Sequence, residues 1–182
     1  MSLRIYGNRL LKTLPGKDTR PTTARVREAI FNIWQERLPG CSWLDICTGS
    51  GAMGAEALVR GAALVMGIER SPRACKIIQE NWQIVALETQ QFTLLKGDAL
   101  LKLKTLAGQQ FDLIYFDPPY AGNLYTPILE LIVRSHLLKP TGELAVEHDP
   151  KLPLPKIGGL EICRQKTYGN TGLTFYRVHS IN

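Results

Sequence analysis

Short, almost wholly apolar segments alternate with amphipathic segments along most of this chain of 182 residues. The apolar segments have the length of buried strands, and the segments between them repeat apolar residues at helical spacing. Strands that are apolar on both faces and are separated by helices form a parallel sheet covered by helices. The chain is therefore predicted to be an α/β protein.

The last part of the chain departs from this alternation. Two strand-like segments flank a turn of small polar residues, which predicts an antiparallel hairpin that closes the sheet. The predicted strands are 42–48, 64–69, 92–98, 112–116, 143–147, 160–168 and 173–179, with the final turn at 169–172. The predicted helices are 22–39, with Thr22 or Thr23 as its cap, 52–60, 72–86 and 127–136.

The charge of the chain is concentrated at its N-terminus. Residues 1–27 contain seven basic residues and one acid, whereas residues 28–182 contain 15 of each sign, so the net charge of +6 arises in the first segment. We therefore predict a basic N-terminal arm, 1–21, on a single domain, 22–182. A basic extension on a neutral body suits the binding of phosphates, and a solubilising tail is the alternative.

Several classes of protein are disfavoured by the composition. No apolar run approaches the roughly 18 residues of a membrane span, and the first 20 residues lack the apolar block of a signal peptide, so we expect a cytoplasmic protein with no membrane partner. The four cysteines form no C-x-x-C pair and the three histidines are scattered, so no metal site is predicted. All four cysteines are expected to be small buried core residues.

A glycine-rich turn connects the first predicted strand of the sheet to a helix. The segment Gly49-Ser50-Gly51-Ala52-Met53-Gly54 fits the pattern G-x-G-x-x-G, and Glu69 ends the next strand 20 residues after Gly49. Glycines allow a ligand to approach the backbone, the helix N-terminus offers free N–H groups, and the carboxylate can hold ribose hydroxyls. The pattern predicts a nucleotide-type cofactor, either a dinucleotide or S-adenosylmethionine (SAM).

The motif Asp117-Pro118-Pro119-Tyr120 follows the strand predicted at 112–116. The prolines stiffen the backbone and leave carbonyls as acceptors, Asp117 adds a carboxylate, and Tyr120 adds a flat ring. Two acceptors and an aromatic face suit the exocyclic amine of an unstacked purine. Hydrogen bonds from both amine protons would favour a pyramidal nitrogen that can attack a sulfonium methyl. We therefore predict methyl transfer, with these four residues as the catalytic ones; a nicotinamide oxidoreductase, which the glycine turn alone would allow, is disfavoured.

The chain resembles the bacterial small-subunit (16S) ribosomal RNA guanine-N2 methyltransferases over essentially its whole length. The segments that carry the resemblance are 4–7, 20–32, 44–54, 117–120 and 168–171. The resemblance implies a Rossmann-like class I methyltransferase, with a mostly parallel seven-stranded sheet, flanking helices and a C-terminal antiparallel hairpin. It also implies that SAM is the cofactor and that a guanine N2 in this RNA is the acceptor.

The resemblance also assigns roles to single residues. Asp45 would lie near the methionine end of SAM, Glu69 on the ribose, and Asp98 with the Ala99 N–H at the adenine edge. The full set of predicted cofactor-binding residues is Asp45, Thr48, Gly49, Ser50, Gly51, Glu69, Arg70, Asp98 and Ala99. The residues predicted to bind RNA are Arg4, Arg9, Arg20, Arg25 and Arg27. The expected partner is ribosomal RNA, within a small-subunit particle or an assembly intermediate, and the protein is expected to be a monomer.

Two residues depart from the usual pattern of this family. Cys47 stands where a larger aromatic is common, which could loosen packing around the cofactor. Asn8 stands where a second glycine is common, and asparagine tolerates left-handed backbone well. Two other functions remain open: adenine-N6 methyl transfer to DNA or RNA, whose enzymes share D-P-P-Y but usually carry a separate reading domain, and a non-enzymatic RNA-binding module.

Overall fold

The computed structural model describes residues 2–13, 22–119 and 123–179. Within these ranges seven strands form one sheet in the order β5-β4-β3-β6-β7-β9-β8, and β1 and β2 form a separate hairpin. The strands are β1 Ser2–Ile5, β2 Arg9–Lys12, β3 Ser42–Ile46, β4 Leu64–Glu69, β5 Gln91–Lys96, β6 Phe111–Phe116, β7 Leu138–His148, β8 Leu160–Tyr168 and β9 Thr171–Val178. The helices are α1 Ala24–Ile33, α2 Ala52–Val59, α3 Pro72–Val85, α4 Ala99–Lys104 and α5 Tyr125–Arg134, with a short 3-10 helix η1 Tyr6–Asn8 between β1 and β2.

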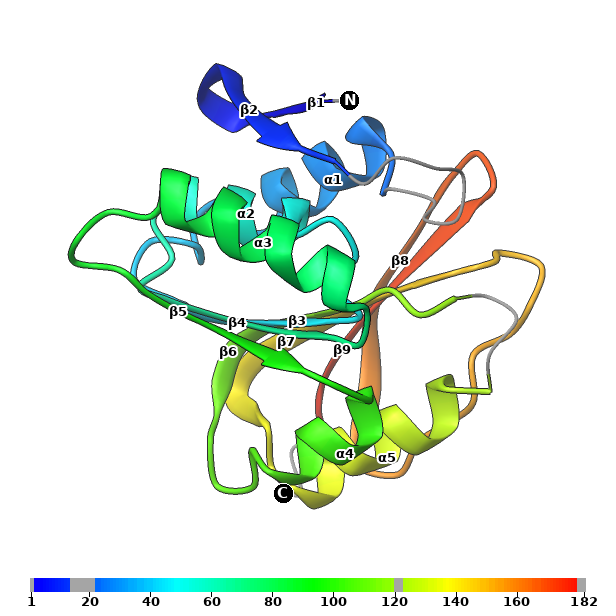
Figure 1. Cartoon of the computed structure of the whole chain (residues 1–182). Coiled ribbons are helices and arrows are strands. Elements are labelled where there is room, and N and C mark those ends of the chain that lie inside the picture. Colours follow the sequence, from blue (N-terminus) through cyan, green and yellow to red (C-terminus); the bar gives the residue numbers. More distant parts are fainter. Residues whose placement is uncertain (1, 14–21, 120–122, 180–182) are drawn as a thin grey trace.

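The sheet is mostly parallel and closes with an antiparallel hairpin. Strands β3 to β7 run parallel to one another, whereas β9 is antiparallel to both β7 and β8. Helices α1, α2 and α3 cover one face of the sheet, and α4 and α5 cover the other (Figure 1). The predicted fold class is confirmed, including the hairpin.

Side-chain caps explain where several helices begin. Thr23 caps α1 by accepting the Val26 N–H at 3.3 Å, and Ser71 caps α3 through the Ala74 N–H at the same distance. The helix predicted to extend to Pro39 ends at Ile33, because Trp34 already leaves helical backbone at the C-cap.

Each face of the sheet has its own hydrophobic core, because successive strand residues point to opposite faces. On β3, Trp43 enters the core beneath α1, α2 and α3, and Leu44 enters the core beneath α4 and α5. Trp43 stacks on Phe31 of α1 with ring centroids 5.4 Å apart. Trp34 packs against Trp43 in a T-shaped arrangement with ring centroids 5.5 Å apart. Helix α1, which follows the basic segment, is therefore an integral part of the fold.

The N-terminal segment contains a hairpin that the sequence did not predict. Its turn uses left-handed backbone at Gly7 (φ 68°) and Asn8 (φ 61°), so the expected tolerance of asparagine is confirmed. The Lys12 N–H donates to Asn81 Oδ1 at 2.9 Å, and Asn81 Nδ2 donates to the Lys12 carbonyl at 2.9 Å. Strand β2 is thereby attached to α3, and the hairpin lies on the α1, α2 and α3 side of the sheet (Figure 1).

The cysteines do not all behave as predicted. Cys41 and Cys75 are buried and Cys47 is half-buried, but Cys163 is exposed. Cys163 lies on β8, an edge strand whose residues are mostly exposed, so its side chain is not in a core.

In the ranges 2–13, 22–119 and 123–179, no helix is both long enough and apolar enough to cross a membrane. The same ranges contain no group of three or more His, Cys, Asp or Glu side chains placed to hold a metal ion.

Close packing of α2 on α3 generates a stability prediction. A Cβ atom at Gly54 would lie 2.3 Å from Trp82 Cζ2, so Gly54→Ala should lower the free energy of unfolding by about 1–3 kcal/mol through overpacking. This loss should appear although alanine favours helix over glycine by about 1 kcal/mol. Urea unfolding measures it, with Gly158→Ala as the control because nothing lies within 4 Å of a Cβ there. A Gly54→Ala variant as stable as the wild type would show that α3 can move away from α2.

Candidate active site

A cleft of about 670 Å³ lies at the carboxyl ends of the central strands. This volume is within the range of about 300–1,000 Å³ that is typical of small-molecule sites. The cleft is lined by Cys47, Gly49, Ile68, Glu69, Arg70, Ser71, Gly97, Asp98, Ala99, Asp117, Pro118, Pro119, Leu124 and Glu147. The cleft therefore joins residues of the glycine turn with residues of the D-P-P-Y motif, as the order of strands in a parallel α/β sheet leads one to expect.

Glu69 connects the end of β4 to the glycine turn. Its Oε2 accepts the Gly49 N–H at 2.9 Å, and its Oε1 accepts the Ser71 N–H at 2.8 Å. Two backbone donors thus orient the carboxylate at the wall of the cleft. The predicted cofactor-binding residues that line the cleft are Gly49, Glu69, Arg70, Asp98 and Ala99.

Three other predicted cofactor residues hold the glycine turn against the neighbouring strands and α3. Thr48 Oγ1 donates to the Asp45 and Ile68 carbonyls at 2.9 and 3.2 Å, which holds the turn between β3 and β4. A Cβ at Gly51 (φ 78°) would lie 3.0 Å from Ile78, so only glycine fits the left-handed backbone against α3. The Ser50 carbonyl accepts from Asn81 at 3.5 Å. The residues that line the cleft do not include Thr48, Ser50 or Gly51.

Asp45 lies beneath the glycine turn and is 1% exposed. Neither of its carboxylate oxygens makes a hydrogen bond with the described residues. Burial raises the pKa of Asp45 to about 8, the negative charge of Glu69 adds to the shift, and the facing Gly54 N–H reduces it. A buried acid that is protonated can ionise when a positive charge binds next to it, because the positive charge favours the carboxylate form.

Asp98 has two functions in this arrangement. Its Oδ1 accepts the Leu101 N–H at 3.1 Å, so it caps α4, and the residue also lines the cleft. Ala99, the first residue of α4, lies beside it in the cleft wall. The cap therefore presents an acid and the start of a helix at the end of β5.

The D-P-P-Y motif reaches the cleft directly after β6. Asp117 is half-buried, Pro118 is buried and Pro119 is exposed, and all three line the cleft. The hydroxyl of Thr22, just before α1, contacts Asp117 Oδ2 at 3.5 Å. Tyr120, the fourth predicted catalytic residue, lies outside the described residues, so its predicted stacking role stays a prediction.

Three polar residues near the motif were not predicted as site residues. The Tyr115 hydroxyl donates to Glu147 Oε2 at 2.7 Å, and it lies 3.0 Å from Thr22 Oγ1. Burial raises the pKa of Tyr115 well above its usual value, and the negative charges of Asp117 and Glu147 add to the shift, so the hydroxyl keeps its proton. The signal that identified Glu69 and Asp117, an acid at the carboxyl end of an apolar strand, would also have identified Glu147.

Cys47 occupies an unusual position in the cleft. Its backbone is left-handed (φ 66°), although it is not a glycine. Burial raises the pKa of its thiol to about 12, and the charges of Glu69, Asp117 and Asp45 contribute in the same direction. The thiol therefore stays neutral and is a weak nucleophile, which disfavours a catalytic cysteine.

The predicted RNA-binding arginines differ in their exposure. Arg4, Arg9 and Arg25 are exposed, and Arg25 lies over the Tyr168 ring at 5.7 Å from its centroid. Arg20 lies outside the described ranges. Three of the predicted cations are therefore accessible, two on the N-terminal hairpin and one on α1.

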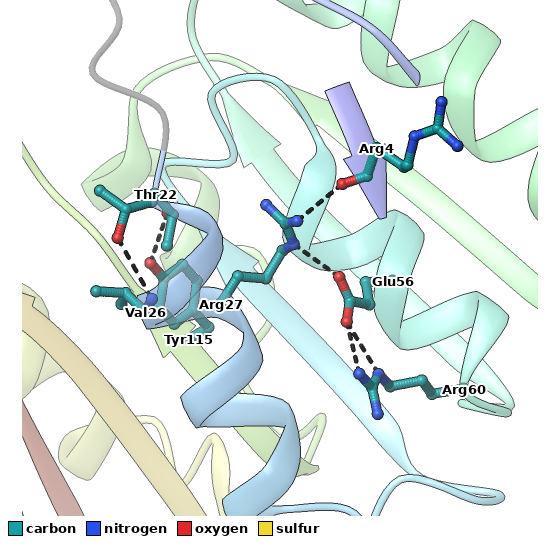
Figure 2. A network of polar contacts seen from close by, with 8 residues as sticks. Arg4, Thr22, Val26, Arg27, Glu56, Arg60 and Tyr115 are labelled. Carbon is teal, nitrogen blue, oxygen red and sulfur yellow. Dashed lines mark hydrogen bonds and ion pairs between the residues drawn. The ribbon is translucent and has the colours of Figure 1, made fainter. Parts of the chain in front are cut away.

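Arg27 is a correction to that set, because it is only 3% exposed. Its Nε donates to Glu56 Oε2 at 2.7 Å and its Nη2 donates to the Arg4 carbonyl at 2.9 Å (Figure 2). The other Glu56 oxygen accepts from Arg60 at 2.9 Å. Arg27 is therefore a structural ion-pair residue that joins α1, α2 and β1, in place of the predicted phosphate contact.

Comparisons with known proteins agree with this site. The family described as Conserved hypothetical protein 95 matches residues 3–177. A Bacillus subtilis (strain 168) protein, provisionally named rRNA methyltransferase YlbH, is 35% identical over 172 residues, covering 93% of each chain. Ribosomal RNA small subunit methyltransferase D of Haemophilus influenzae is 30% identical over 176 residues, covering 96% of this chain and 90% of that protein.

A solved structure extends the similarity to the whole fold. An Escherichia coli protein, provisionally described as the methyltransferase yhhF, matches over 100% of both chains with a TM-score of 0.84 and 26% identity. The fold is that of the Rossmann-like class I methyltransferases, and the names of the similar proteins favour methyl transfer over nicotinamide chemistry.

The raised pKa of Asp45 predicts a pH dependence of stability. The pKa rises from 3.8 to about 8 on folding, so between these values the folded protein holds a proton that the unfolded chain lacks. The free energy of unfolding should therefore fall as the pH rises from about 4 to about 8. The Asp45→Asn variant has no titratable group at this position, so its urea midpoint should change less than that of the wild type over the same pH range. Parallel pH profiles for the two proteins would mean that Asp45 is ionised in the fold.

Proposed function

Since the chain belongs to the family described as Conserved hypothetical protein 95, we propose that it is a SAM-dependent methyltransferase that modifies the N2 amine of a guanine in small-subunit ribosomal RNA. The observation that carries this proposal is the cleft in which Glu69 and Asp98 lie with Asp117 and Pro118. The similar proteins named as ribosomal RNA methyltransferases support RNA as the substrate. The two hydrogen-bond acceptors at Asp117 and Pro118 support an exocyclic amine as the group that receives the methyl.

The residues at the cofactor end of the cleft fit SAM. Glu69 is oriented by two backbone N–H groups, and each of its oxygens has a second lone pair for a ribose hydroxyl. Asp98 and Ala99 line the same cleft, and we propose that the Asp98 carboxylate and the Ala99 N–H bind the adenine edge. The buried Asp45 holds a proton in the free protein and would ionise when the positive charge of SAM approaches. When bound, SAM supplies a methyl group on a positively charged sulfur.

The residues at the substrate end act on the amine. Asp117 and the Pro118 carbonyl accept hydrogen bonds from its two N–H groups, which directs the nitrogen lone pair toward the cofactor end of the cleft. As the nitrogen takes the methyl group and the methyl–sulfur bond breaks, positive charge would develop on the nitrogen next to the Asp117 carboxylate, which stabilises it until one N–H proton is lost. Tyr120 is proposed to stack on the extruded base.

The N-terminal hairpin and the start of α1 are proposed to hold the RNA. Arg4, Arg9 and Arg25 are exposed, and the remainder of the chain from residue 28 onward has no net charge. The small-subunit particle or an assembly intermediate is the proposed substrate, because residues 28–182 carry no net charge and so add little electrostatic affinity for protein-free RNA. We further propose that the protein acts as a monomer in the cytoplasm.

The role of Asp117 can be tested directly. Asp117→Asn should lower methyl transfer by about 10²–10³-fold, because an amide cannot stabilise the developing positive charge, while SAM affinity stays nearly unchanged. The assay uses small-subunit RNA or particles from cells that lack the gene, with mass spectrometry of the nucleosides, and calorimetry measures SAM binding. Asp112→Asn is the matched control, since Asp112 lies at the other end of β6 and pairs with Lys139.

Three outcomes would contradict the proposal in different ways. Full activity of Asp117→Asn would place the reaction elsewhere. Methylated adenine would favour the adenine-N6 alternative, and preference for a nicotinamide cofactor over SAM would exclude methyl transfer.

The role of the arginines predicts a salt dependence. If Arg4, Arg9 and Arg25 contact phosphates, RNA affinity should fall with salt, and each Arg→Ala change should flatten the slope of log K against log [salt] by about 0.7–0.9. SAM affinity should not change. Arg134→Ala is the control, because this exposed arginine lies on α5 on the opposite side of the sheet. Slopes equal to that of the wild type would mean that the hairpin only adds solubility.

A further inference from the structure

Glu147 is a buried carboxylate that the proposed reaction does not yet use. It lies near the end of β7, after the apolar residues Leu144, Ala145 and Val146, and it is 4% exposed. Glu147 is nevertheless one of the residues that line the cleft, and its Oε2 accepts the Tyr115 hydroxyl at 2.7 Å. Glutamate is rarely buried to this degree, so a buried acid that lines the cleft is a candidate for contact with the substrate.

The register of the sheet places Glu147 next to Asp117. Strands β6 and β7 are parallel and pair Phe116 with Val146, so Asp117 and Glu147 are the next residues of the two neighbouring strands. Neighbouring strands lie about 4.7–4.9 Å apart. Tyr115 and Ala145, two residues earlier, both enter the core beneath α1, so the alternation of strand side chains directs Asp117 and Glu147 to that same face.

The order of strands also determines on which side of Asp117 this acid lies. The proposed cofactor residues belong to β3, β4 and β5, whereas β7 lies on the opposite side of β6. A base whose amine is held at Asp117, with the amine facing the cofactor, therefore extends toward β7. Glu147 is the carboxylate that such a base would meet next.

We propose that Glu147 is a specificity-determining residue that accepts the N1–H of the target guanine while Asp117 and Pro118 hold the neighbouring N2 amine. This inference rests on the proposed function and deepens it. On the Watson–Crick edge of guanine, N1–H and N2–H₂ are adjacent donors, so two neighbouring carboxylates match them. In adenine the atom next to the amine is an unprotonated N1, whose lone pair a carboxylate repels. The arrangement therefore selects guanine over adenine.

Tyr115 positions this carboxylate. Its hydroxyl donates to Glu147 and also lies 3.0 Å from Thr22 Oγ1, which in turn contacts Asp117. Because the raised pKa keeps the hydroxyl protonated, Tyr115 remains a donor to Glu147. The two acids that read the base are thus linked through Tyr115 and Thr22, and the tyrosine is a positioning residue.

The test compares guanine with 2-aminopurine at the mapped target position of the small-subunit RNA. 2-Aminopurine keeps the N2 amine but has an unprotonated N1. The wild type should prefer guanine, whereas Glu147→Gln places an amide donor opposite N1. We expect Glu147→Gln to lower kcat/KM for guanine by about 10- to 100-fold and to lower the guanine-to-2-aminopurine preference by a similar factor. SAM affinity should remain within about two-fold, because β6 separates β7 from the strands that carry the proposed cofactor residues.

Two further variants separate recognition from folding. Glu143→Gln removes another buried carboxylate of β7, one that pairs with Arg37 and Arg177, so it reproduces a structural cost without changing the preference. Tyr115→Phe keeps the carboxylate but removes its donor, and it should lower the preference for guanine by about 2- to 10-fold. If Glu147→Gln does not fold, the Tyr115→Phe variant tests whether Glu147 determines the preference for guanine.

The possible results are distinguishable. An unchanged guanine preference in Glu147→Gln, or in Tyr115→Phe if the first variant does not fold, overturns this inference while the proposed function stands. If the wild-type protein methylates no guanine in the RNA or the particle, the proposed function itself fails.

Discussion

Parallel strands end at the same edge of a sheet, and the candidate site depends on this constraint. The acids Asp45, Glu69, Asp98, Asp117 and Glu147 lie at or just beyond the ends of five successive strands in space, β3, β4, β5, β6 and β7. They are spread over about a hundred residues of sequence, yet the strand register brings four of them into one cleft and buries the fifth beneath it. Negative charge is costly to concentrate, so the protein holds each acid with backbone donors, a hydroxyl or a proton.

Buried polar contacts attach the N-terminal segment to the helices behind the site. Arg27 pairs with Glu56 of α2, and Asn81 of α3 bonds both to the backbone of β2 and to the Ser50 carbonyl of the glycine turn. Arg60 also lies over the Tyr6 ring at 4.0 Å. The proposed RNA-binding hairpin and the proposed cofactor turn are therefore both attached to α2 and α3. A displacement of the hairpin would thus be expected to shift the turn as well.

Much of the candidate site could be predicted because it follows local rules. A glycine turn after a buried strand, an acid at the end of the next strand and the D-P-P-Y motif are each readable within a few residues of sequence. Asp98 was expected to face the cofactor, and it lines the cleft while it also caps α4. Arg27 could not be assigned correctly, because its partner Glu56 is 29 residues away and only the packing of α1 on α2 brings them together.

The sequence by itself determined the alternation of strands and helices, the closing hairpin, the glycine turn and the acids at the strand ends, since apolar periodicity and backbone preferences act over short distances. Only the tertiary structure decided the order of the strands, the attachment of the N-terminal hairpin to α3 and the place of Glu147 beside Asp117. The physical reason is that strand register and helix packing are set by contacts between segments far apart in the chain. Burial then changes what a side chain can do: an arginine in a basic stretch becomes a structural ion pair, and an acid in an apolar strand becomes part of the cleft.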